Sequence, residues 1–368
     1  MRTMGIMAAT LLAASALGSA SAQTITYTVD CAKGQTIAGA LARADSRSPL
    51  LVNVRGTCNE FVAIARDNVT LRGDPTATIV APNATSDVVA VDGNGVTLEN
   101  LTLTGGYYGV RNNQVVRLNV RNSVIQDTAS DGIRVFVGDT RVIGSTIQRA
   151  GGNGVYVTRG GSLGASGNSQ FLNNANAGIY AYGNSTAAVS GSTISGNVTG
   201  VRLEPGAEGT FSNTTISGNS GVGITVASSQ ATIGGNNVIT NNGAWGIWVY
   251  SGSTATIYGN RVADNAWDGI SGDIGTTLIL NGNQITGNGS FGVACRTNCT
   301  MELNGETLEG NGGGGVLVET GSKLMFANGT THWTGDGWGL QCSDKESSVG
   351  NLGLFDGTVS DTCTDFDH

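Results

Sequence analysis

Arginine, tyrosine and tryptophan recur at one position of a repeated glycine motif, two residues after the glycine. The first members of this set are Arg111, Arg134, Tyr156, Tyr180, Arg202, Thr225 and Trp248. A second set follows two residues later and includes Tyr182, Glu204 and Tyr250. Guanidinium groups pair with carboxylates or sulfates, and aromatic rings offer flat apolar faces to sugars. This mixture predicts a surface that contacts a polysaccharide.

The same residue types could perform β-elimination on a uronate sugar. That reaction requires neutralisation of the sugar carboxylate, a base and an acid. We predict Arg134, Tyr180 and Arg202 as the catalytic residues, and a bound calcium ion is an alternative way to neutralise the carboxylate. The substrate contacts are predicted at Arg111, Tyr156, Tyr182, Glu204, Trp248 and Tyr250. The alternative is that these side chains only stabilise a sheet surface by cross-strand packing.

Carboxylates later in the chain provide a hydrolase hypothesis. A glycoside hydrolase needs two carboxyl groups about 5 to 9.5 Å apart, and Asp273 and Glu319 occupy the second set two repeats apart. Arg296 lies between them, which favours an ion-pair ladder over a catalytic pair. Asp268, directly before a motif glycine, is a further hydrolase candidate. No zinc site is predicted, because the chain has two histidines and no Cys-x-x-Cys pair.

All of these positions belong to one repeat. The glycine motif starts at Gly109, Gly132, Gly154, Gly178, Gly200, Gly223, Gly246, Gly269, Gly292, Gly315 and Gly339. The ten steps cover 230 residues, a mean of 23 per repeat. Because side chains on a strand alternate between faces, the residue two after each glycine is expected to point outward between buried neighbours.

Apolar and asparagine columns recur with the same period. The first apolar column is Val120, Val142, Val189, Phe211, Ile233, Ile257, Leu280 and Leu303. The second is Ile125, Ile147, Ile194, Ile216, Val238, Val262, Ile285 and Leu308. The asparagines are Asn174, Asn197, Asn219, Asn241, Asn265, Asn288 and Asn311. Stacked amides can hydrogen-bond from coil to coil, and one repeat alone cannot enclose a core. The sequence therefore predicts an all-β parallel solenoid with about 23 residues per coil.

The start of the chain differs from the repeats. Residues 35–44 place Ile37, Leu41 and Ala44 on one helical face, which predicts a short capping helix, and residues 51–57 follow as a first strand and turn. With this helix, Gly56-Thr57, residues 69–73 and the coil repeats, the sequence resembles the pectin-lyase-like superfamily of right-handed β-helix proteins. The resemblance implies a single-stranded right-handed parallel β-helix over residues 23–368, with residues 333–368 as a C-terminal cap.

The resemblance does not imply one activity, because the superfamily includes lyases, hydrolases, epimerases and non-catalytic binders. The acidic clusters and the Asp-His constellation of its familiar pectate lyases and epimerases are absent from this sequence. The paired-aspartate and His-Gly signatures of its polygalacturonases are absent as well. The coil repeats carry the resemblance, so it is specific for the fold.

The N-terminal segment and the cysteines both indicate that the protein is exported. Arg2, the apolar residues 6–17 and Ala20-Ser21-Ala22 predict a signal peptide over residues 1–22. No membrane insertion is expected, and we predict a periplasmic or extracellular location. Six cysteines fit disulfides in an oxidising compartment. Proximity favours the pairs Cys31–Cys58, Cys295–Cys299 and Cys342–Cys363, although the pairing cannot be derived from the sequence alone.

The charge distribution limits the class of partner. The formal net charge of −8 disfavours nucleic acid. Residues 23–202 hold 14 basic and 11 acidic residues, whereas residues 203–368 hold 4 basic and 16 acidic residues. An anionic ligand is therefore expected on the first half.

The leading hypothesis is a secreted β-helix that engages an extended, anionic polysaccharide between Arg111 and Tyr250. If the chain is catalytic, a lyase is favoured over a glycoside hydrolase. The rival class is a non-catalytic binding, adhesive or structural surface protein. The oligomeric state and the identity of the glycan stay open.

Overall fold

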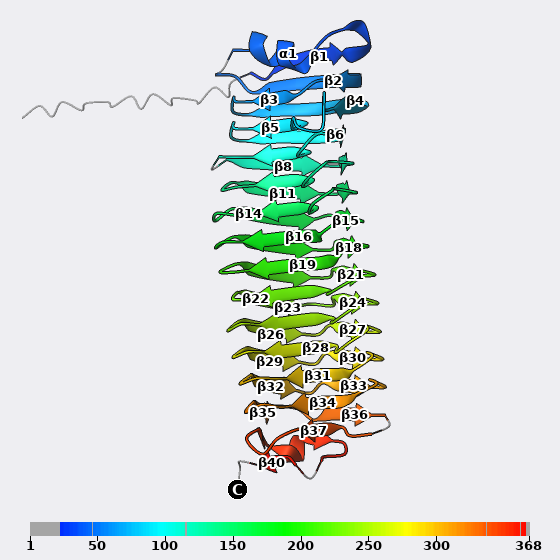
Figure 1. Ribbon diagram of the computed structural model, residues 1–368. Coiled ribbons are helices and arrows are strands. Elements are labelled where there is room, and N and C mark those ends of the chain that lie inside the picture. The colour runs from blue at the N-terminus through cyan, green and yellow to red at the C-terminus, as the bar shows by residue number, and fades with distance from the viewer. Residues whose placement is uncertain (1–22, 46, 115, 336, 361, 366–368) are drawn as a thin grey trace, which may run out of the picture.

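The chain forms a tall stack of β-strand coils, as the computed structural model shows (Figure 1). The structure describes residues 23–365 apart from positions 46, 115, 336 and 361, so the predicted signal peptide lies outside the described residues. The paired strands of neighbouring coils are parallel, as in β16–β19 and β20–β23. The predicted parallel solenoid is confirmed.

A 13-stranded sheet, here called sheet B, forms one side of the stack. Its strands are β3 (Val62–Ile64), β5 (Val89–Val91), β7 (Val110–Asn112), β10 (Ile133–Val135), β13 (Val155–Val157), β16 (Ala177–Tyr182), β19 (Thr199–Glu204), β22 (Ile224–Ala227), β25 (Ile247–Tyr250), β28 (Ile270–Asp273), β31 (Phe291–Cys295), β34 (Gly314–Val318) and β37 (Leu340–Cys342). From β7 onward each strand begins at or near a motif glycine, so sheet B carries the predicted outward column.

A 27-stranded sheet, here called sheet A, forms the rest of the wall in two series. The first series is β1 (Ile25–Asp30), β2 (Leu50–Asn59), β4 (Val69–Val80), β6 (Val96–Thr104), β8 (Arg117–Arg121), β11 (Asp139–Ile143), β14 (Ser162–Ser166), β17 (Thr186–Ser190), β20 (Glu208–Ser212), β23 (Gln230–Gly234), β26 (Thr254–Tyr258), β29 (Thr277–Asn281), β32 (Thr300–Asn304), β35 (Lys323–Phe326), β38 (Ser348–Gly350) and β40 (Thr364–Asp365). The second series is β9 (Val124–Gln126), β12 (Thr146–Gln148), β15 (Gln170–Leu172), β18 (Thr193–Ser195), β21 (Thr215–Ser217), β24 (Val238–Thr240), β27 (Arg261–Ala263), β30 (Gln284–Thr286), β33 (Thr307–Glu309), β36 (Thr331–Thr334) and β39 (Phe355–Asp356).

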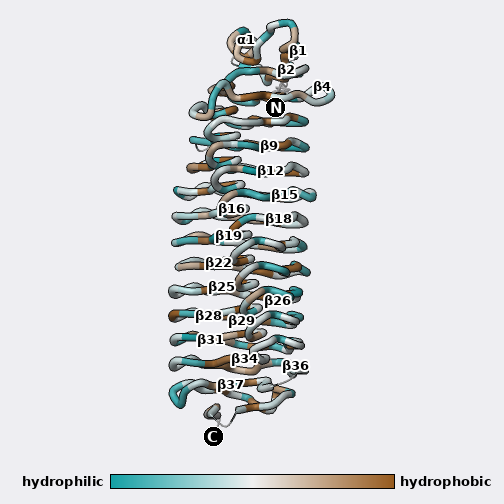
Figure 2. The backbone as a smooth tube through the Cα atoms, turned by 45° about the vertical axis from the view of Figure 1, so that its right-hand side comes forward, coloured by the Kyte–Doolittle hydropathy of each residue, from teal (hydrophilic) through white to brown (hydrophobic). Residues whose placement is uncertain are grey.

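Hydrophobic and hydrophilic residues alternate along the coils (Figure 2), and the apolar ones fill the interior. The first predicted apolar column is in register, since Val189 pairs with Phe211 and Phe211 with Ile233. The second column is wrong at one member. Ile216 pairs with Ile239, which is fully buried, whereas Val238 is half-buried one residue earlier.

The asparagine ladder is present, with the same one-residue correction. From Asn197 on, each side-chain Oδ1 accepts the backbone N–H and the Nδ2–H of the asparagine one coil earlier, as Asn219 does from Asn197 at 3.0 and 3.1 Å. The next member is Asn242, at 3.2 and 2.9 Å from the same atoms of Asn219. Asn241, the predicted member, is exposed with a φ of 55°. These bonds satisfy buried polar groups at the turn.

A second ladder follows sheet A and was not predicted. It runs through Asn237, Asn260 and Asn283 and continues to Glu306, whose Oε2 accepts the Asn283 backbone N–H at 2.7 Å. All four side chains are buried. The three asparagines repeat every 23 residues in the sequence, but the repeat of residue type ends because the fourth position is a glutamate.

The motif glycines are required by close approach between coils. A Cβ atom on Gly246 would lie 2.6 Å from the carbonyl oxygen of Gly269, and one on Gly223 would lie 2.5 Å from that of Gly246. Real Cβ atoms do not approach carbonyl oxygens so closely. The 23-residue glycine period therefore records where neighbouring coils touch backbone to backbone.

The N-terminal end of the stack is covered by a helix, and a disulfide lies near each end. Helix α1 (Ile37–Arg43) lies over the first coil, and Glu60 accepts the Ile37 and Ala38 N–H groups at its N-terminus. This confirms a capping helix within the predicted 35–44. The short 3-10 helices are η1 (Cys31–Lys33) and η2 (Leu352–Leu354). The three disulfides are those that proximity favours: Cys31–Cys58, Cys295–Cys299 and Cys342–Cys363.

Candidate functional site

The outward column of sheet B has the predicted register. Arg111 pairs with Arg134, Tyr156 with Tyr180, and Tyr180 with Arg202. Thr225 pairs with Trp248, and Tyr182 with Glu204 in the second column. Strand spacing places successive members about 4.8 Å apart. The sheet thus brings all nine predicted site residues onto one face.

Carboxylates neutralise the arginines at the start of this face. Asp87 forms an ion pair with Arg111, and Asp131 binds Arg134 at 2.8 Å. The Asp131 side chain is 3% exposed, and its other oxygen accepts two N–H groups of Asn153 at 2.9 Å. A buried carboxylate with three partners fixes the Arg134 guanidinium, which lies 3.8 Å from the Tyr156 ring centroid.

Tyr180 lies at the centre of the face. Its ring stacks on Tyr156 with centroids 4.6 Å apart and 9° between planes. Its hydroxyl donates to Glu204 Oε2 at 2.8 Å, while Arg202 Nη2 donates to Oε1 of the same carboxylate at 2.5 Å. Glu204 therefore orients both predicted catalytic side chains of this region.

The electrostatics of this group favour a protonated phenol. Burial raises the pKa of Tyr180, and the hydrogen bond to Glu204 and the negative charge of that carboxylate raise it further. Burial and the charge of Glu204 likewise raise the pKa of Tyr250. A tyrosine base needs a lowered pKa. These hydroxyls are consequently suited to donating hydrogen bonds at neutral pH.

A cluster of indoles lies two coils after Arg202. Trp248 stacks between Trp245 and Tyr250, with centroid distances of 4.5 and 4.0 Å. Trp267 meets Trp245 edge to face at 4.2 Å and 84°. The Trp248 Nε1–H is buried without a hydrogen-bond partner in the described part of the chain.

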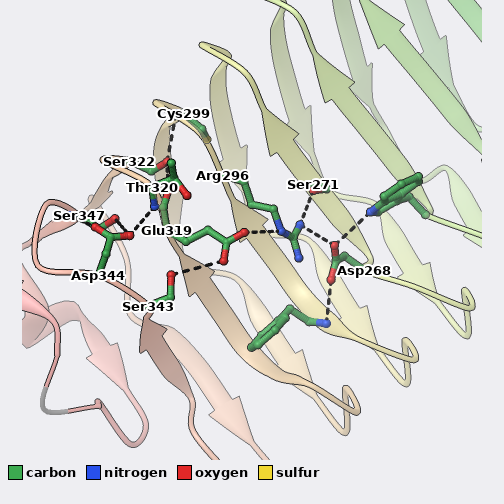
Figure 3. A network of polar contacts seen from close by, with 12 residues as sticks. Asp268, Ser271, Arg296, Cys299, Glu319, Thr320, Ser322, Ser343, Asp344 and Ser347 are labelled. Carbon is green, nitrogen blue, oxygen red and sulfur yellow. Dashed lines mark hydrogen bonds and ion pairs between the residues drawn. The ribbon is translucent and has the colours of Figure 1, made fainter.

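Next to the indoles, Arg296 joins two carboxylates in a polar network (Figure 3). Its Nη1 lies 2.7 Å from Asp268 Oδ2, and its Nε lies 3.0 Å from Glu319 Oε1. The expected ladder therefore forms, but Asp268 takes the place predicted for Asp273. The reason is that Asp268 lies on the turn before β28, where its buried side chain also receives Trp245 Nε1–H at 3.1 Å.

Asp87, Asp131 and Trp267 were not among the predicted site residues. Asp131, Trp245 and Asp268 all precede a motif glycine directly. This position is the signal that could have found Asp131, whereas Asp87 and Trp267 do not occupy it. Val222 and Thr199 hold the same position in other coils, so the residue before the glycine does not repeat in type.

One group of three potential metal ligands occurs among the described residues, formed by Cys31, Cys58 and Glu60. Both cysteines are disulfide-bonded, and the Glu60 carboxylate accepts the helix N–H groups. This group consequently does not provide a cation site. None of the helices in the described ranges has the length and hydropathy to cross a bilayer.

Known proteins resemble the chain in its architecture. The family described as a right-handed β-helix region matches residues 58–204 and 177–331. The periplasmic alginate epimerase AlgG is 12% identical, with 85% of this chain and 86% of that chain covered and a TM-score of 0.58. The catalytic unit of a GH87 α-1,3-glucanase from Streptomyces thermodiastaticus strain HF3-3 is 14% identical, with 88% and 70% covered and a TM-score of 0.53. No curated protein matches significantly. At such identities the likeness shows a shared fold.

Proposed function

This chain belongs to the family of right-handed β-helix regions, and we propose that it is an exported carbohydrate-interacting protein that binds an extended polysaccharide across the outward face of sheet B. The single observation that carries the proposal is the row of Arg, Tyr and Trp side chains from Arg111 through Tyr180 to Tyr250, which is interrupted at Thr225. Stacked aromatic rings and fixed guanidinium groups lie next to one another along it. Large apolar patches on a protein surface often mark ligand-binding sites.

The direction of the ligand follows from the register. The row crosses successive strands, so a bound chain runs along the axis of the stack. Basic residues exceed acidic ones only in residues 23–202, which supports acidic sugar units at the Arg111 to Arg202 end. The similar solved structures include an alginate epimerase and a glucanase, and three disulfides fit an oxidising compartment.

Lyase chemistry is the second candidate, and it depends on the meeting of Tyr180, Glu204 and Arg202. In this proposal Arg202 and Arg134 face the uronate carboxylate, and the Tyr180 hydroxyl donates a proton to the departing sugar. The raised pKa of Tyr180 leaves proton abstraction to another group. The glycoside-hydrolase hypothesis is weakened, because Asp268 and Glu319 are both engaged by Arg296.

The test combines retention and turnover. Purified mature protein is run through native gels containing single polysaccharides, and unsaturated uronate absorbance and reducing ends are followed in parallel, with and without calcium. Retention without turnover establishes a binding protein; absorbance with new ends establishes a lyase; reducing ends alone establish a hydrolase. Absence of retention and of turnover on all polysaccharides overturns the proposal in favour of a structural role.

Two variants of one residue separate stacking from proton donation. Tyr180→Ala removes the ring and should abolish retention, whereas Tyr180→Phe keeps the stack on Tyr156 and should retain the glycan. If the chain is a lyase, Tyr180→Phe loses turnover. Tyr258→Ala is the matched control, because Tyr258 is 44% exposed on sheet A.

A further inference from the structure

Trp267 differs from the other indoles of its cluster in exposure. Trp245, Trp248 and Tyr250 cover one another face to face, whereas Trp267 stands at 84° to Trp245 and is 48% exposed. An indole ring that is half exposed forgoes part of the stabilisation that burial of its apolar surface would give. It comes from the turn before β28, beside the outward face of sheet B.

The support under Trp267 is fixed by hydrogen bonds. Trp245 Nε1 donates to Asp268 Oδ2, which also accepts Arg296 Nη1 at 2.7 Å. Asp268 Oδ1 accepts the Phe291 backbone N–H at 3.0 Å, and the Asp268 side chain is 3% exposed (Figure 3). Trp245 is therefore a positioning residue, and Trp267 is the ring that remains available.

Charge distinguishes this end of the face from the other. One guanidinium, Arg296, serves two carboxylates, Asp268 and Glu319, so the network beside Trp267 carries excess negative charge. At the other end Arg111 and Arg134 each meet one carboxylate. A sugar carboxylate placed at Trp267 would be repelled, whereas the C–H face of an uncharged sugar would not.

We propose that Trp267 is the stacking ring of a subsite for a neutral hexopyranose unit. This inference rests on the proposed function and adds the class of sugar at one end of the face. Tyr180 and Trp248 lie three coils apart, about 14 Å at the usual strand spacing. A polysaccharide that fits both regions carries neutral units beyond the segment bound by the arginines.

The test is isothermal titration calorimetry of the mature protein with two neutral hexamers, cellohexaose and mannohexaose, and two acidic ones, hexagalacturonate and hexamannuronate. At least one neutral hexamer should bind, and Trp267→Ala should weaken it tenfold or more. Trp267→Phe should recover part of the loss. Trp338→Ala is the matched control: Trp338 is 47% exposed near the last coils, and its removal should change the affinity less than twofold.

Several outcomes would overturn the inference. These are binding of acidic hexamers alone, binding of neutral hexamers that Trp267→Ala and Trp338→Ala change equally, and no binding of any hexamer. Thermal melting of each variant shows that it is folded. If polysaccharide retention depends on Tyr180 but not on Trp267, the proposed function stands and only this inference fails. If retention depends on neither residue, the proposed function fails as well.

Discussion

Glu306 holds the place of an asparagine in the second ladder, because its Oε2 accepts the backbone N–H of Asn283 at 2.7 Å. In the coils before it, Asn260 and Asn283 also donate Nδ2–H to backbone carbonyls, at 2.8 and 2.9 Å. A carboxylate has no such hydrogen, and Glu306 Oε1 has no hydrogen-bond partner among the described residues. A protonated Glu306 would supply the missing donor.

Glu306 should therefore make the stability of the protein depend on pH. Burial raises the pKa of Glu306 to about 7, against the opposing effect of hydrogen bonds from Asn283. The folded state binds this proton more tightly than the unfolded state. The stabilisation by protonated Glu306 is therefore fully present below the unfolded pKa of about 4.3. It falls as the pH rises through 7. We expect Glu306→Gln to gain about 3 kcal/mol at pH 8, since an amide supplies the donor at every pH.

Denaturant midpoints at pH 5, 6, 7 and 8 provide the measurement. The Glu306→Gln midpoint should vary less over this range than that of the unmodified protein. Glu309→Gln, an exposed change on the next strand, should leave the variation as it is. Equal pH dependence in all three proteins would contradict the assignment.

Removing the side chain of Asn242, a member of the first ladder, should destabilise the fold, whereas removing that of its neighbour Asn241 should not. Asn242→Ala removes the acceptor of two Asn219 N–H groups and two donor contacts of its own. Leaving buried donors unpaired should cost about 3 kcal/mol. Asn241→Gly removes an exposed side chain at positive φ, where glycine is unstrained, and should cost less than 1 kcal/mol. Urea denaturation compares them, and similar losses would refute the ladder at Asn242.

The sequence predicted the coil period and the outward column because both depend on repeated residue types at fixed spacing. It failed where adjacent residues share a type: Val238 and Ile239, or Asn241 and Asn242, fit the pattern equally, and only packing chooses between them. It also failed where a turn bends the chain. Asp268 and Trp267 precede their strand, so strand alternation could not place them beside Arg296 and Trp245.

Close approach of coils should make the motif glycines intolerant of any side chain. In Gly246→Ala the new Cβ would meet the Gly269 carbonyl oxygen at 2.6 Å and Val262 Cγ1 at 2.7 Å. We expect a loss of about 3 kcal/mol from overpacking. Gly164→Ala on sheet A is the control, because its Cβ would meet only Arg141 Cγ, at 3.8 Å. It should be neutral in thermal melting, and a tolerated Gly246→Ala would contradict the close-contact explanation.

Arg134 should matter for folding as well as for ligand, and a double substitution separates the two. Arg134→Gln leaves the Asp131 carboxylate buried without its ion pair, which should cost about 3 kcal/mol. Asp131→Asn with Arg134→Gln removes both charges and keeps an acceptor for Asn153, so the pair should be more stable than the sum of single effects predicts.

Glycan retention by the folded double variant then decides the role of Arg134. If the guanidinium contacts an acidic sugar, the double variant melts near the unmodified protein but is retained weakly by an acidic polysaccharide. The deficit should shrink in high salt, because salt screens the ionic contact that only the unmodified protein makes. Full retention by the double variant would show that Arg134 serves to neutralise Asp131 and to hold the Tyr156 ring, with no direct contact to the ligand.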